Sequence, residues 1–268
     1  MRIHKAGDIQ YITFDNITSA GFATHAFSTR IGGVSQGVYR GMNLGLSRGD
    51  SREAVLENYS RFSEAVGFDW RSVVFSNQVH SSNVYRAGVA DMGNGILRES
   101  KIWDMDALIT NEPGVTLQTF HADCVPVFLA DPIKRAVGLV HAGWMGTLKE
   151  ISRICLERMA TEFGTKPGDV LVGIGPSIGP YSFETDDDVA DRFKQELGFS
   201  CDFLYQSGHK FLIDLWGINR TSLERAGVKS HNIEDSYLCT LKHPEMFFSH
   251  RKMGNARGTM AAFISISV

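Results

Sequence analysis

Residues 115–150 read VTLQTFHADCVPVFLADPIKRAVGLVHAGWMGTLKE and contain the two apolar runs around which the rest of the chain is organised. The first run, 115–129, is β-prone and carries Cys124; Asp131-Pro132 then forms a turn. The second, 136–141, ends in His141, and a helical pattern follows over 147–163. Seventeen residues separate Cys124 from His141, enough for a strand, a turn and the neighbouring strand. We therefore expect adjacent strands that bring a thiol and an imidazole together.

Working outward, further β-prone segments centre near residues 10, 26, 74, 108, 171, 212, 238 and 262, and helical periodicity covers 51–66, 186–197 and 216–226. Strands and helices do not alternate regularly, which argues against a doubly wound Rossmann fold. The 268 residues contain only seven prolines and no low-complexity linker, so we expect one domain spanning 1–268.

Composition excludes several classes of protein. A net charge of -3 gives no basic excess, which argues against nucleic acid as a partner and leaves small molecules as the expected substrates. No stretch of roughly 18 apolar residues and no signal-like start occur, so we expect a cytoplasmic protein that does not contact the membrane. The four cysteines form no CxxC pair, which fits reduced thiols.

Individual residues leave the chemistry open. Cys124 with His141 suits a nucleophile and its base. His80 lies among polar neighbours and, by itself, reads as a surface residue. The glycine-rich loop 31–37 after Arg30 suits either an anion cradle or a tight turn. Asp104 and Asp106 share one face of an extended strand, which suits acid–base work, a hard cation or a solvated surface.

Eight short motifs occur along the chain. They cover residues 27–35, 43–45, 78–80, 106–110, 122–126, 141–144, 173–176 and 249–251. These motifs occur in the order found in the laccase-domain or polyphenol oxidase family, whose members are now commonly called purine nucleoside phosphorylases. The chain resembles that family over about residues 25–265, and eight ordered motifs are far more specific than one.

The resemblance implies an α+β fold with a mixed two-layer β-sheet core flanked by helices. It also implies that His80, Cys124 and His141 hold one metal, usually zinc. Two imidazoles and a thiolate fill three tetrahedral positions and leave the fourth open, as a catalytic zinc site requires. The ligands are 44 and 17 residues apart, so the site depends on the finished tertiary fold.

The activity implied is phosphorolysis of adenosine, inosine, guanosine and methylthioadenosine, together with hydrolytic deamination of adenosine. A water acidified by the metal suits attack on the adenine ring, with Asp123 or Asp106 as the proton shuttle. In a regular strand Asp123 would face away from Cys124, so this role needs a bulge. Phosphorolysis also needs an anion pocket, for which Arg30, the 31–37 loop and Arg251 are candidates. The 43–45 motif adds Asn43 as a substrate-binding candidate.

Three alternatives stay open at this stage. Copper could occupy the same three ligands and give a weak phenol oxidase, although conventional laccase architecture is excluded because it needs about ten histidines, largely in His-x-His pairs. The chain has nine histidines and no such pair. The second alternative is a metal-free Cys124 nucleophile with His80 or His141 as its base, for which the resemblance implies an amidohydrolase that edits cell-wall precursors. A non-enzymatic binding role is the third. The chain is expected to be a monomer or a homodimer.

Overall fold

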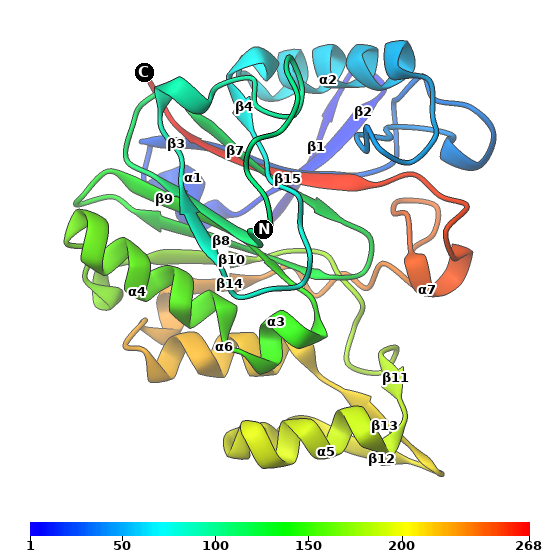
Figure 1. Cartoon of the computed structure of the whole chain (residues 1–268), viewed down its shortest axis with the longest axis vertical. Helices are drawn as coiled ribbons and strands as arrows, with labels where there is room; N and C mark the ends of the chain where they lie inside the picture. The colour runs from blue at the N-terminus through cyan, green and yellow to red at the C-terminus, as the bar shows by residue number, and fades with distance from the viewer.

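The computed structural model describes residues 1–268, and two six-stranded mixed sheets form its centre (Figure 1). The first sheet has the order β1 (Arg2–Ala6), β2 (Ile9–Thr13), β3 (Ala23–Ser28), β15 (Met260–Ile266), β7 (Thr116–His121) and β4 (Val73–Val74). The second has the order β14 (Ile233–Asp235), β10 (Leu171–Ile174), β8 (Val125–Asp131), β9 (Ala136–Ala142), β6 (Ala107–Thr110) and β5 (Val84–Arg86). Only the pairs β4–β7, β10–β14 and β5–β6 are parallel.

The two sheets pack against each other through large apolar side chains. Phe27 and Ile264 from the first sheet share one buried cluster with Phe128 and Leu139 from the second. Every residue of β8 and β9 is buried, because one face of these strands meets the first sheet and the other meets helices.

Helices cover the outer faces of both sheets (Figure 1). The apolar stripe of α2 (Arg52–Val66) places Tyr59 and Phe62 against the first sheet. Ser51 caps this helix by accepting the N–H of Ala54. On the second sheet, α4 (Ile151–Phe163) and α6 (Leu215–Arg225) bury one apolar face each. This arrangement confirms the expected single-domain α+β fold with mixed sheets.

The remaining elements are short or lie at the margin. They are α1 (Asp15–Ser19), α3 (Trp144–Leu148), α7 (His250–Met253), and α5 (Asp187–Glu196) beside a small sheet of β11 (Glu184–Thr185), β13 (Lys210–Ile213) and β12 (Leu204–Ser207). Short 3₁₀ helices occupy Gly37–Tyr39, Trp70–Ser72, Val89–Asp91, Pro167–Asp169, Gly198–Phe203 and Ser230–Asn232. None of the helices has the length and apolar character needed to cross a membrane.

Three local expectations were wrong. The run 115–129 is two strands in different sheets, because the chain bends at residues 122–124, where Asp123 has a left-handed φ of 91°. The helix expected over 147–163 is divided into α3 and α4 at Glu150, whose φ is 56°. The strand expected near 238 is absent; β14 lies upstream, and Cys239 forms only an isolated bridge with Ser177.

Candidate metal centre

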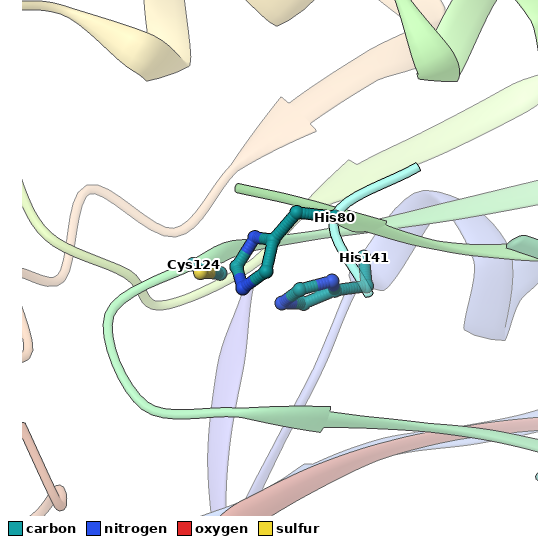
Figure 2. A group of neighbouring side chains, drawn as sticks. All are labelled: His80, Cys124 and His141. Carbon is teal, nitrogen blue, oxygen red and sulfur yellow. The ribbon is translucent and has the colours of Figure 1, made fainter. Parts of the chain in front are cut away.

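Three side chains from three separate segments converge at the end of the second sheet. His80 lies in the loop between β4 and β5, Cys124 directly precedes β8, and His141 lies near the end of β9. The β8–β9 register pairs Pro126 with His141, which brings the neighbouring Cys124 to the same place. One possible ligand atom from each side chain lies within 4.8 Å of the other two. Figure 2 shows the two rings and the sulfur directed toward one another.

Asp106 holds two of the three segments in position. Its fully buried carboxylate accepts hydrogen bonds from the backbone N–H groups of Val79, His80 and Ser81 at 3.1, 3.0 and 2.7 Å. It also lies 2.8 Å from Nδ1 of His141. A proton on that nitrogen leaves Nε2 with a free lone pair for the cluster, the arrangement in which a carboxylate orients a metal-binding histidine.

The backbone at His80 is strained, with a left-handed φ of 60°. Few non-glycine residues adopt this conformation, and the three amides held by Asp106 stabilise it here. Gly143 makes room for the ring, since a Cβ at that position would lie 2.4 Å from Nδ1 of His80 and 3.2 Å from Sγ of Cys124. Nδ1 of His80 is buried and has no hydrogen-bond partner.

The electrostatic field at His141 favours positive charge. Burial acts to lower the pKa of His141, but the negative charge of Cys124 and the hydrogen bond that the ring donates to Asp106 outweigh it and raise that pKa to about 9. Burial and the neighbouring charge of His141 lower the pKa of His80. The same field that keeps a proton on His141 would stabilise a bound cation.

The donor set therefore fits a metal ion. Two imidazole nitrogens and one thiolate sulfur are the ligands that zinc and copper share, and three protein ligands leave a coordination position for water or substrate. The geometry does not distinguish between the two metals. His121 is not part of this set, although its ring centroid lies 5.4 Å from that of His141. Its nitrogens contact Thr119 Oγ1 and the Cys124 carbonyl at 2.7 and 3.0 Å, as expected for a packed residue.

His80 and Cys124 lie between two cavities. The first, of about 490 Å³, has an apolar wall that includes Trp144 and Phe183, and it is also lined by four acidic residues, Asp123, Glu184, Asp186 and Asp188. The second, of about 420 Å³, is lined by His141, by aromatic side chains including Phe75 and Phe120, and by two arginines, Arg48 and Arg257. The cluster is therefore accessible to small molecules from two sides.

The two aspartates proposed as proton shuttles differ in placement. Asp123 lines the first cavity, and its left-handed φ of 91° shows that the backbone is irregular there and not a regular strand. Its carboxylate accepts hydrogen bonds from Thr240, Ser249 and the N–H of Arg251. Asp106 is completely buried, and although burial acts to raise its pKa, hydrogen bonds from His141 and Ser81 lower it to about 2. A group that stays ionised and has no access to substrate does not suit a shuttle, so this expectation is corrected to a positioning role.

The expected substrate-binding residues are dispersed. Arg251 lines the first cavity, with its guanidinium donating to the carbonyl of Glu184 at 2.9 Å. Arg30 lies elsewhere, at the glycine-rich loop, where it donates to the carbonyls of Pro244 and Arg40 and stacks on Phe248. The structure therefore does not bring Arg30 to the cluster.

Asn43 is also removed from direct contact, since it is fully buried. Its amide donates to Asp50, and its carbonyl oxygen accepts the N–H groups of Gly45 and Thr259. These bonds join two segments that line the second cavity, so Asn43 positions the cavity wall.

Several residues that line the cavities were not identified from the sequence. The most important of them are Arg257 and Arg48, which line the second cavity. Arg257 is only 5% exposed, follows a glycine-containing turn and lies three residues before the buried strand β15. An arginine so close to a mainly apolar strand was the available signal.

The two-sheet fold and the His-Cys-His cluster define an α+β protein with a candidate mononuclear metal site. The chain belongs to the family described as multi-copper polyphenol oxidoreductase laccase, whose model matches residues 24–267. This confirms the family expected from the motifs.

Similar proteins support the same assignment. Purine nucleoside phosphorylase YlmD of Bacillus subtilis is 35% identical over 90% of this chain and 87% of its own length. A purine nucleoside phosphorylase of Bacteroides thetaiotaomicron is 35% identical over 97% of both chains. The crystal structure of YlmD from Geobacillus stearothermophilus superposes with a TM-score of 0.92 at 33% identity, covering 99% of this chain and 98% of the other.

Proposed function

We propose that the protein is a zinc-dependent purine nucleoside enzyme acting at His80, Cys124 and His141. Its reactions would be phosphorolysis of adenosine, inosine, guanosine and methylthioadenosine, and hydrolytic deamination of adenosine. The observation that carries the proposal is the convergence of three metal-binding side chains between two cavities. The names of the similar proteins support the substrate class.

The chain's own residues would divide the work as follows. His80, Cys124 and His141 would hold the metal, which when bound supplies Lewis-acid chemistry and acidifies a water molecule. Asp106 keeps His141 in the tautomer that binds a cation. Asp123, which lines the first cavity, is the candidate for moving a proton. Arg251 at the same cavity is a candidate substrate contact.

Two alternatives act at the same residues. Copper bound by the three ligands would give a phenol oxidase, a reading that the family's description favours. Without metal, Cys124 beside a proton-bearing His141 would suit an amidohydrolase acting on cell-wall precursors. We also propose a cytoplasmic location, which four free cysteines support, and a monomer or homodimer.

Metal analysis of protein purified without chelator tests the first part of the proposal. We expect about one zinc per chain, as one three-residue site implies. A content far below one zinc or copper per chain would contradict the ligand set. Activity of metal-free protein that is lost on thiol alkylation would favour the amidohydrolase.

Incubation of adenosine with and without phosphate tests the reactions themselves. Phosphorolysis yields adenine and ribose 1-phosphate, whereas deamination yields inosine. His80→Ala and Cys124→Ala should each abolish both reactions while the fold persists, and Cys201→Ala, at an exposed cysteine, is the matched control. Full activity in either of the first two variants would refute a shared site.

A further inference from the structure

Arg257 is a buried cation that forms no salt bridge. Its side chain is 95% buried in the wall of the second cavity, and its Nε has no hydrogen-bond partner. Its Nη1 donates only to the carbonyl of Gly258 and to Oγ1 of Thr259, at 2.9 and 3.4 Å. A buried guanidinium is normally compensated by a carboxylate or another anion, because desolvation of an unpaired charge is unfavourable.

A second arginine lies beside it. Asn43 accepts the N–H groups of Gly45 and Thr259, and the Leu44 N–H donates to the Thr259 carbonyl, so the segment 43–48 packs on the segment 257–259. A Cβ on Gly45 would lie 3.0 Å from Thr259 and 3.2 Å from Cγ of Arg48, so the glycine allows this close approach. Arg48 is exposed at the mouth of the same cavity.

The proximity of the two positive charges is unfavourable. Burial, and after it the charge of Arg48, lower the pKa of Arg257 to about 10. The negative groups that counteract this are Asp123 and Cys124, and Asp123 already accepts hydrogen bonds from other partners. Neither arginine has a carboxylate partner of its own, so an anion between them would remove the repulsion.

The two cavities differ in charge in a way that separates their ligands. The first carries four carboxylates around Arg251, which repel an anion and suit the hydroxyl groups of a sugar. The second carries Arg48 and Arg257 and extends to the same His80 and Cys124. A planar guanidinium fork matches the oxygens of phosphate, and two such groups favour it over a singly charged ion.

We propose that Arg257 and Arg48 form the inorganic phosphate subsite of this enzyme, in the cavity on the His141 side of the cluster. The inference rests on the proposed phosphorolysis and gives it a location different from the Arg30 and Arg251 positions expected from the sequence. Arg257 supplies the buried contact with phosphate, and Arg48 supplies a second charge from the entrance.

The test is calorimetric titration of the purified protein with inorganic phosphate, in the absence of nucleoside. We expect Arg48→Gln to weaken phosphate binding about 10-fold or more, the range for a lost charge-assisted contact. Arg257→Lys keeps the charge and loses the fork, so it should also weaken binding. Circular dichroism checks that each variant folds, and the exposed Arg71→Gln is the matched control. Arg48→Gln provides a test even if the buried Arg257 variant does not fold.

The outcomes separate this proposal from the proposed function. Unchanged phosphate affinity in Arg48→Gln and in folded Arg257→Lys, or a larger loss with Arg251→Gln than with Arg48→Gln, would overturn the subsite. So would a failure of the wild-type protein to bind phosphate. Arginine-dependent phosphate binding by a protein that forms no ribose 1-phosphate would support the subsite and overturn the phosphorolysis. In an active enzyme, Arg48→Gln should raise KM for phosphate with a much smaller effect on KM for the nucleoside.

Discussion

Replacing Asp106 by asparagine is the sharpest test of how the candidate metal centre is held together. The carboxylate accepts five hydrogen bonds, from three backbone amides, the hydroxyl of Ser81 and the ring of His141. Asparagine has almost the same shape but only one acceptor oxygen. If that oxygen replaces Oδ2, the new NH₂ group faces the N–H of His80 and the ring nitrogen of His141, both of which are donors.

The expected loss follows from this count. Two hydrogen bonds to a charged group disappear, each contributing roughly 1.5–3 kcal/mol, so Asp106→Asn should lower the free energy of unfolding by about 3 kcal/mol or more. His141 also loses the partner that fixes its tautomer, which should weaken zinc binding roughly 10- to 100-fold. Urea unfolding at pH 7 measures the first effect, and chelator competition measures the second.

Asp104→Asn is the matched control, since Asp104 is two residues away, exposed and in a left-handed conformation that asparagine tolerates. The control should change neither quantity appreciably. If Asp106→Asn alters the free energy of unfolding by less than about 1 kcal/mol and leaves zinc affinity unchanged, the positioning role assigned to Asp106 is wrong.

Three further substitutions test the electrostatics, the cluster and the core. Burial lowers the pKa of His25 from 6.5 to about 4, so the unfolded chain binds the proton first as pH falls. About 3 kcal/mol of the free energy of unfolding should therefore be lost between pH 6.5 and 4. Urea titrations of His25→Gln should show a flatter dependence of this free energy on pH, and a slope equal to that of the wild type would contradict this. Gly143→Ala should displace the ring of His80 and lower zinc occupancy, measured by metal analysis, with the fold retained, whereas Gly198→Ala, which meets nothing within 4 Å, should bind zinc normally. Phe128→Ala should lower the free energy of unfolding by about 3–5 kcal/mol in denaturant titration, because the ring is fully buried between the sheets; a loss below 1 kcal/mol would contradict that packing.

The individual strands and helices were largely predictable, whereas their partners were not. Alternation and apolar runs show that a segment is a strand, but they carry no information about its neighbour. Strand β15 lies between β3 and β7, and its partner β3 is more than two hundred residues upstream. The run 115–129 looked like one strand because β7 and β8 are both buried, and only the bend at Asp123 assigns them to different sheets.

The candidate site was predictable only in part for a related reason. Cys124 directly precedes β8 and His141 lies in the neighbouring strand β9, so local spacing alone suggested that they meet. His80 comes from a loop among polar residues, and only the resemblance to a family pointed to it. Arg30 was expected at the site because it adjoins a glycine-rich loop, whereas Arg257 was missed because it follows an ordinary turn. Tertiary packing places only Arg257 beside the cluster.

The backbone conformation at the cluster explains why such patterns fail there. Left-handed turns are usually marked by glycine or asparagine, yet His80 and Asp123 adopt them with φ of 60° and 91°. Each is stabilised from outside its own segment, His80 by the carboxylate of Asp106 and Asp123 by Thr240, Ser249 and the N–H of Arg251. The residue type at these positions is therefore determined by the chemistry of the side chain, and the strain is balanced by distant hydrogen bonds. A change at Asp106 should consequently affect the backbone of His80 and the ring of His141 together, because this one carboxylate fixes the positions of both ligands.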